Sequence, residues 1–341
     1  MPEKKLMLTI KNKSFWDRAG MIFFAASFLF VVVMLAVVAV QNRVAPFGEF
    51  INILEQNLWG LPLAVLMVAA AIIAEVARYT NLLYQTSGRV MPLTAFRVAM
   101  YGRFVDSLSP YMWGGRGFQA RYLNRMNDNL AVSYTIPYIQ RFIKQVIFNL
   151  LFAVFFLSVK IDNNDVALVI KILVYISLLY RSFLPLTFLV FTINERFGRM
   201  LLIGSLAVLY RLRIVKDYHA FFDRAIRYVD DVLYAIKHEI KSLASMVIMI
   251  LGVIVEFMAS MSIPFFLYIA VGGDMHYSYI LVLYMYSFVA AQAYPTPGGT
   301  GLAEFAFYAM FLTYVQSEML FWFLLMWRLF TYYIYILSVL L

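Results

Sequence analysis

Two short stretches of the chain carry residue types that could bind an anion in an apolar environment. SPYMWGGRGFQAR, at 109–121, and PTPGGTGLAEF, at 295–305, each place a proline shortly before Gly-Gly-x-Gly. Proline ends one helix, glycine permits tight turns, and the next helix begins with backbone N–H groups that lack intrahelical partners. These N–H groups and the positive end of the helix dipole together favour the binding of a negatively charged phosphate group at such a helix start. The two stretches therefore predict a binding site for the phosphate of a lipid headgroup.

Charged side chains follow both stretches and suggest how a headgroup would be held. We expect the amides of 114–118 and 298–302 to bind phosphate, and Arg121 and Arg125 to attract it. Glu304 would meet a cationic headgroup or fix a helix end. The alternative is that both breaks are kinks that only help helices to pack, but two similar breaks favour binding. The candidate substrate-binding residues are Pro110, Gly114, Gly115, Gly117, Gln119, Arg121, Arg125, Glu256, Pro297, Gly298, Gly299, Gly301, Glu304 and Arg328.

Ionisable side chains inside apolar segments form a second group, because each is expensive in hydrocarbon unless it is paired or hydrated. Glu75 and Arg78 lie three residues apart, which permits an ion pair within one helix. Arg141 and Lys144, also three apart, either reach the membrane interface or line a cavity for phosphate. Glu256 and Arg328 lie near the middle of their segments, so they are the better candidates for an interior pair or a polar path. The sequence does not assign their partners.

Most catalytic chemistries find no support in the sequence. The chain has no cysteine, and His219, His238 and His276 do not have the spacing of metal ligands. The sequence contains no P-loop, no Ser-His arrangement and no paired carboxylates. We therefore expect no metal, no cofactor and no catalytic residues. An intramembrane enzyme that acts on lipid or peptide is the minor alternative.

The elements that must position these residues are membrane helices. Hydrophobic residues make up 63% and charged residues 14% of the 341 residues, whereas soluble domains have about 25% charged residues. The mean hydropathy is +0.79. Most of the charges behind the formal net charge of +9 flank apolar runs, where anionic lipid at the cytoplasmic face explains them better than nucleic acid does. The composition indicates a polytopic membrane protein.

The apolar runs predict an all-α transmembrane helix bundle in a single domain, 1–341. Two regions, about 93–128 and 279–316, are apolar but interrupted by Pro and Gly, and we expect them to be re-entrant helix hairpins. Corresponding breaks in two halves suggest an inverted repeat. We expect the first run to be an uncleaved helix rather than a signal peptide. The predicted spans, each near the 20 residues that cross about 30 Å of hydrocarbon, are 20–40, 61–84, 134–158, 166–192, 243–270 and 318–341.

Charge in the connections predicts the orientation in a plasma or inner cell membrane. The N-terminus, 78–128 and 193–241 are rich in basic residues and should be cytoplasmic. Within 193–241, the stretch 216–241 repeats apolar residues in steps of three and four, which predicts an amphipathic connecting helix. The connections 41–60, 159–165 and 271–278 are slightly acidic. They alternate with the basic connections along the chain, as external loops should.

The second stretch resembles a known signature. PTPGGTGLAE, at 295–304, is similar to the P-x-P-G-G-x-G-x-x-E pattern of the lysylphosphatidylglycerol synthase transmembrane domain, the flippase part of the multiple peptide resistance factor proteins. YGRFVDSLSPYMWGGRGFQARYL, at 101–123, resembles the first re-entrant stretch of that family. Phe118 stands where the commoner pattern has Glu, so no role of that acid is transferred. The resemblance covers essentially the whole chain. It implies two hairpins that meet near the membrane midplane and the transport of a lipid.

These observations lead to one main functional hypothesis and a rival. We expect a flippase that moves a phospholipid or lipid-linked anion between leaflets without nucleotide hydrolysis. No soluble aminoacyl-lipid synthase domain is expected. The rival is a scaffold or regulator that transports nothing and whose breaks only shape a docking surface. A homodimer would be compatible with an apolar surface, and the sequence identifies neither the lipid nor the direction of its movement.

Overall fold

The computed structural model describes residues 44–109, 114–127, 130–159, 168–211, 242–293 and 298–337, with single positions outside these ranges. Within them the chain forms helices and no strands, which confirms the predicted all-α class. The elements are α2 (Phe47–Gln56), α3 (Gly60–Ser87), α4 (Pro92–Leu108), α5 (Gly114–Asn127), α6 (Leu130–Ser158), α7 (Leu168–Ile193), α8 (Glu195–Arg211), α10 (Leu243–Ala270), α11 (Tyr277–Ala290), the 3₁₀ turn η1 (Ala291–Ala293), α12 (Leu302–Phe311), α13 (Leu320–Arg328), the π-helical turn η2 (Leu329–Tyr333) and α14 (Ile334–Leu337).

Four helical segments of the described chain are long and apolar enough to cross a membrane. These segments are Gly60–Ser87, Ile136–Ser158, Leu243–Ala270 and Leu320–Leu337. They confirm the predicted spans 61–84, 134–158, 243–270 and 318–341. The predicted span 166–192 is helical as α7, with an apolar part over Leu168–Leu179. The predicted first span, 20–40, and the amphipathic stretch 216–241 lie almost wholly outside the described residues. The orientation of the chain in the membrane stays a prediction.

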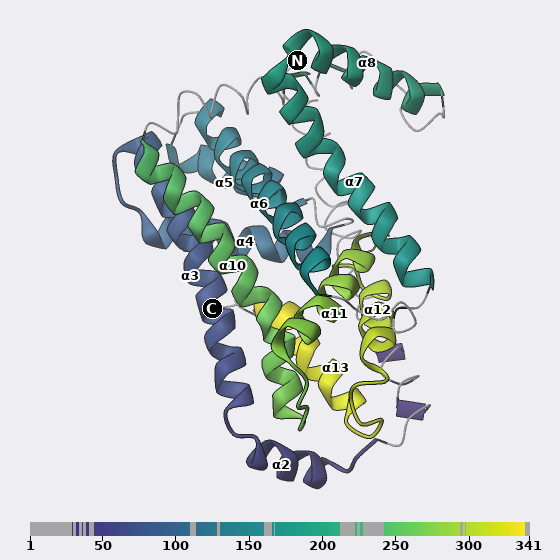
Figure 1. Ribbon diagram of the computed structural model, residues 1–341. Coiled ribbons are helices and arrows are strands. Elements are labelled where there is room, and N and C mark those ends of the chain that lie inside the picture. Colours follow the sequence, from purple (N-terminus) through teal and green to yellow (C-terminus); the bar gives the residue numbers. More distant parts are fainter. Residues whose placement is uncertain are drawn as a thin grey trace, which may run out of the picture.

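The helices α3 and α10 pack closely along their length and form the frame of the molecule (Figure 1). Small residues let the two backbones approach. A Cβ atom at Gly60 would lie 2.7 Å from the backbone nitrogen of Ala270, and one at Gly252 would lie 2.6 Å from Cγ of Arg78. Close packing of this kind is how membrane helices associate, because lipid provides no hydrophobic force between them. It also brings the polar residues of both helices to one depth.

Both predicted breaks are interruptions between helices. The first break, 109–113, separates α4 from α5, and the second break, 291–301, separates α11 from α12. In the second break Gly298, Gly299 and Gly301 have φ angles of 60°, 68° and 93°, which lie in the left-handed region that favours glycine. The prolines that precede these glycines, Pro110 and Pro297, lie outside the described residues. That these hairpins re-enter the membrane stays a prediction.

Aromatic side chains pack α12, the helix after the second break, against α13. The ring of Phe307 in α12 stacks on the ring of Trp327 in α13, with centroids 4.1 Å apart. Phe311 and Phe323 extend the same buried cluster, and each is fully buried. Such stacked rings add to the stability gained from burial. The second break is therefore held against α13 by a rigid apolar core.

Candidate functional site: a charge cluster beside two helix breaks

Charged side chains from four helices meet in the interior of the bundle. We call them the charge cluster. Its four basic side chains outnumber its three carboxylates, and each member is paired with a residue of another helix. The cluster consists of Glu75 and Arg78 from α3, Arg103 and Asp106 from α4, Arg141 and Lys144 from α6, and Glu256 from α10.

Glu256 is the hub of the charge cluster. It lies half-way along α10, and its Oε2 pairs with Nη2 of Arg78. Its Oε1 accepts hydrogen bonds from Nη2 of Arg103 at 2.8 Å and from Nζ of Lys144 at 2.6 Å. Arg103 also pairs through its Nε with Glu75. One buried carboxylate therefore joins α10 to three other helices.

The charge cluster is closed at one end and open at the other. The side chain of Arg78 is 1% exposed and that of Glu256 is 3% exposed. In contrast, Lys144 is 46% exposed, Arg141 is 30% exposed and Asp106 is 26% exposed. Arg141 and Asp106 are loosely paired, with 3.7 Å between Nη1 and Oδ2. The protein therefore leaves the cluster uncovered at Asp106, Arg141 and Lys144, which we call the open end.

The helix after the first break begins with amides that already have partners. The N–H of Gly115 donates to Oδ1 of Asp106 at 2.8 Å, and the N–H of Gly114 donates to Oγ of Ser109 at 2.8 Å. The sequence predicted that the amides of 114–118 bind phosphate, and for 116–118 this stays a prediction. At Gly115 the carboxylate of Asp106 occupies the position that an anion would take, because α4 ends beside the start of α5.

The second break has the same chemistry in a buried form. The N–H of Gly301 donates to Oε2 of Glu304 at 2.6 Å, and Oε1 of Glu304 lies 2.6 Å from Nε of Arg328. Glu304 is fully buried, as are the neighbouring glycines. Of the two roles that the sequence offered for Glu304, the structure shows the fixing of a helix end. Both breaks therefore place a carboxylate between an amide of a helix start and an arginine.

The two breaks lie next to each other. The hydroxyl of Tyr332 in η2 donates to the carbonyl oxygen of Ser107, near the end of α4, at 3.2 Å. A Cβ atom at Gly298 would lie 3.0 Å from that same oxygen and would overlap the Tyr332 ring. The guanidinium of Arg328 lies 5.3 Å from the centre of the Tyr332 ring. Tyr332 thus joins the end of α4, beside the first break, to the second break.

The remaining predicted residues lie on α5. Gln119 is buried, and its Nε2 donates to the carbonyl oxygen of Val98 at 3.0 Å, which ties α5 to α4. Arg121 and Arg125 are exposed, and Nε of Arg121 donates to the carbonyl oxygen of Gly117 at 3.0 Å. Gln119 is thus a packing residue in this structure, while the two arginines are on the surface.

The ion pairs differ from those that the spacing suggested. The spacing left a pair of Glu75 and Arg78 within one helix as one possibility, but Glu75 pairs with Arg103 and Arg78 pairs with Glu256, on the helices packed against α3. Glu256 and Arg328 do not pair with each other, since Arg328 pairs with Glu304. Sequence reasoning did not select Arg103 and Asp106 as site residues. Their signal was present, since both are charged residues of an apolar segment directly before the first break.

Comparison with known proteins agrees with this architecture. The family described as the lysylphosphatidylglycerol synthase TM region matches residues 24–338. A protein named UPF0104 membrane protein, from Archaeoglobus fulgidus, is 21% identical over 250 residues, which are 72% of this chain and 74% of that protein. The chain belongs to the lysylphosphatidylglycerol synthase transmembrane region family.

Proposed function

We propose that this protein moves an anionic phospholipid, or a lipid-linked anion, between the leaflets of its membrane. The acyl tails stay in the bilayer while the headgroup passes the open end of the charge cluster. The observation that carries the proposal is the cluster itself, which holds more basic than acidic groups among membrane helices and is accessible at one end. Family membership supports a role with lipids.

The cost of such a cluster favours a role in transport. Charged side chains within a membrane are expensive even when they are paired, and they commonly mark the path of a polar substrate. Fixed charges replace the water that a headgroup must leave behind. Because the basic groups are in excess, a negatively charged headgroup would be stabilised more than a neutral one. The substrate class that fits is therefore a lipid phosphate.

Lys144 is the side chain best placed to exchange partners. It shares Oε1 of Glu256 with Arg103, so Glu256 keeps two cationic partners when Lys144 leaves it. Lys144 is also half exposed, whereas the side chain of Arg78 is 1% exposed, so Lys144 is the partner of Glu256 that can turn outward. Turning Lys144 from Glu256 to a phosphate would exchange one anionic oxygen for another, at a lower cost than moving the buried Arg78. In the same step Arg141 would leave Asp106 for the phosphate.

A polar face on α6 extends from the open end. Ser133, Gln140 and Lys144 lie on one side of this helix by its 3.6-residue period. Ser133 and Gln140 are buried, and neither side chain has a hydrogen-bond partner among the described residues. Pro137 lacks an N–H, so the carbonyl oxygen of Ser133 loses its usual intrahelical donor as well. Polar groups of this kind need water or a ligand, which supports a headgroup path along α6.

The second break has a different part in this proposal. Its amides and its glycines are buried, and Glu304 is already paired, so it does not offer a phosphate site in this conformation. We therefore assign the headgroup to the first break and the open end of the charge cluster. The second break would serve as the rigid wall against which the first hairpin is held.

The proposal is tested with vesicles that contain the purified protein and a trace of fluorescent phospholipid. A membrane-impermeant quencher then reports how fast labelled lipid from the inner leaflet becomes accessible. We expect phosphatidylglycerol to move faster than phosphatidylcholine. Lys144→Gln and Arg141→Gln should each slow the movement about tenfold, which corresponds to about 1.4 kcal/mol of lost headgroup stabilisation.

A matched control is available outside the site. Arg196→Gln also removes one basic side chain, but from the exposed start of α8, and it should leave the rate unchanged. Unchanged lipid asymmetry with the unmodified protein would contradict the proposal and favour a scaffold. Release of free headgroup in the same vesicles would instead indicate an enzyme.

A further inference from the structure

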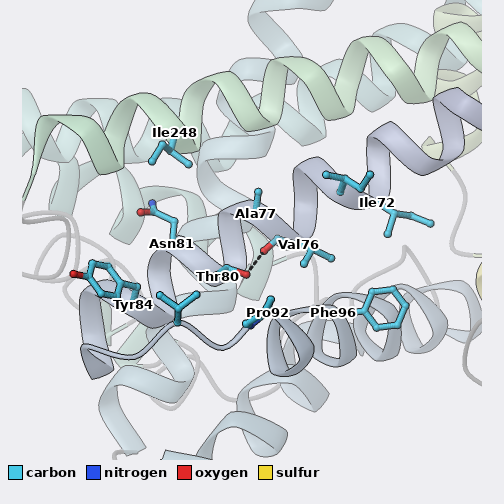
Figure 2. Close-up of a pocket in the computed structure, with 11 residues that line it drawn as sticks. Ile72, Val76, Ala77, Thr80, Asn81, Tyr84, Pro92, Phe96 and Ile248 are labelled. Atoms are coloured by element: carbon cyan, nitrogen blue, oxygen red, sulfur yellow. Dashed lines mark hydrogen bonds between the residues drawn. The ribbon is translucent and has the colours of Figure 1, made fainter.

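A groove with a volume of about 620 Å³ lies outside the charge cluster, between α3, α4 and α10 (Figure 2). Its lining runs along α3 from Ile72 to Tyr84. Pro92 and Phe96 of α4 form one wall, and Ile248 of α10 forms the other. Tyr84 lies at the end of the groove nearest the connection to α4, and Ile72 lies at the opposite end.

The lining suits an apolar occupant. Its two polar side chains other than Tyr84 already have partners within the protein. The hydroxyl of Thr80 donates to the carbonyl oxygen of Val76 at 2.8 Å, and Nδ2 of Asn81 donates to Oγ of Ser245 at 2.8 Å. The rest of the groove is aliphatic or aromatic. A polar ligand would therefore lose its hydration without replacement, whereas a hydrocarbon chain would not.

The length of the groove matches one leaflet of a membrane. The 12 residue steps from Ile72 to Tyr84 rise about 18 Å at 1.5 Å per residue. Half of the hydrocarbon core is about 15 Å thick. The helix that carries the groove is itself long and apolar enough to span the membrane. An acyl chain lying beside α3 could thus fill the groove from end to end.

The end at Tyr84 has the character of a headgroup region. Tyr84 is 50% exposed, and tyrosine is enriched where membrane helices meet water. Arg89, in the connection to α4 and next to the lining residue Val90, is exposed near this end. Exposed basic residues at the membrane surface attract anionic lipid. The groove thus combines an apolar trough with a basic end, as an anionic phospholipid requires.

We infer that this groove binds a resident anionic phospholipid, with an acyl chain between Ile72 and Tyr84 and its phosphate near Arg89. The site is separate from the proposed translocation path. Glu75 and Arg78 lie on the other side of α3, where they pair with Arg103 and Glu256. The bound lipid completes the contact between α3, α4 and α10 and stabilises it.

The inference is tested by filling the groove. Ala77 lines it and is exposed, so Ala77→Trp should occupy the space of the acyl chain. Val65→Trp is the control, because Val65 is on the same helix, is 54% exposed and is not part of the lining. After extensive washing in detergent, mass spectrometry of the purified protein should find stoichiometric phospholipid in the unmodified chain and in the control, but not in Ala77→Trp.

A second measurement does not depend on a bulky substitution. Added phosphatidylglycerol should raise the melting temperature of delipidated protein, because a ligand that binds the folded state stabilises it. Arg89→Gln should reduce this rise more for phosphatidylglycerol than for phosphatidylcholine. Equal lipid retention in both Trp variants, or an equal rise in all variants, would show ordinary boundary lipid and overturn the inference.

The outcome is distinguishable from that of the proposed function. Lys144→Gln should keep the resident lipid while it slows lipid movement. Ala77→Trp should lose the resident lipid while labelled lipid still crosses the bilayer. Loss of both properties in Ala77→Trp would show that the groove belongs to the translocation path and would overturn the separate site.

Discussion

Replacing Glu256 with Gln tests whether the charge cluster depends on one carboxylate. The change removes a negative charge that three cations share, while the shape of the side chain is kept. Arg78, which is 1% exposed, would be left buried without its carboxylate. Breaking a buried pair in this way costs about 3–5 kcal/mol. The other two cations would not be left buried and unpaired, since Arg103 keeps Glu75 and Lys144 is 46% exposed. We therefore expect Glu256→Gln to lower the free energy of unfolding by about 3–5 kcal/mol.

The assay is reversible unfolding of the protein in mixed micelles with increasing denaturing detergent. The double variant Arg78→Met, Glu256→Gln should recover part of the loss, because no unpaired guanidinium remains buried. Neighbouring groups of this kind typically show coupling energies of about 0.5–3 kcal/mol. Glu318→Gln is the control, since Glu318 is exposed and such surface changes stay within about 0.5 kcal/mol. A loss below about 1 kcal/mol for Glu256→Gln would refute the reasoning, as would a double variant less stable than the single one.

Three further predictions concern the path and the second break. Gln140→Leu removes a buried amide that has no hydrogen-bond partner in the part of the chain that the structure describes, so it should raise the free energy of unfolding by about 1–3 kcal/mol. The same variant should slow lipid movement in vesicles, and an unchanged rate would exclude Gln140 from the path. Glu304→Ala should lower the free energy of unfolding by about 3–5 kcal/mol, because it leaves a buried guanidinium unpaired. Gly298→Ala should cost more than the about 1–2 kcal/mol of left-handed backbone, since its Cβ overlaps Tyr332. Gly88→Ala, also at positive φ but with open space around it, should show the backbone cost alone, and equal melting temperatures for the two variants would contradict the steric argument.

The sequence predicted those features of the fold that depend on local chemistry. The lengths of apolar runs located helices such as α3 and α10, because about 20 apolar residues are needed to cross hydrocarbon. The positions of proline and glycine located both breaks, since these residues interrupt helices wherever they occur. Neither signal requires knowledge of which helix lies beside which.

The ion pairs could not be predicted in the same way. Spacing along one helix places Glu75 near Arg78, but the partner of each is decided by the helices that pack against α3. The packing of α4 brings in Arg103, and that of α10 brings in Glu256. Charged residues near a predicted break in an apolar segment deserve the same weight as the Gly-rich motif itself. By that criterion Arg103 and Asp106 would have been candidates.

The two breaks also suggest how one hairpin could bind substrate while the other holds the fold. In each, a carboxylate accepts a hydrogen bond from the amide of a helix start and pairs with an arginine. Glu304 and its arginine are buried and 2.6 Å apart, whereas Asp106 and Arg141 are partly exposed and 3.7 Å apart. Only the looser pair can admit a phosphate without leaving a buried charge unpaired. Asp106 therefore acts in our proposal as an internal anion that the headgroup replaces. This exchange ties translocation to Arg141, so Arg141→Gln should slow phosphatidylglycerol more than phosphatidylcholine, and equal slowing of both lipids would contradict it.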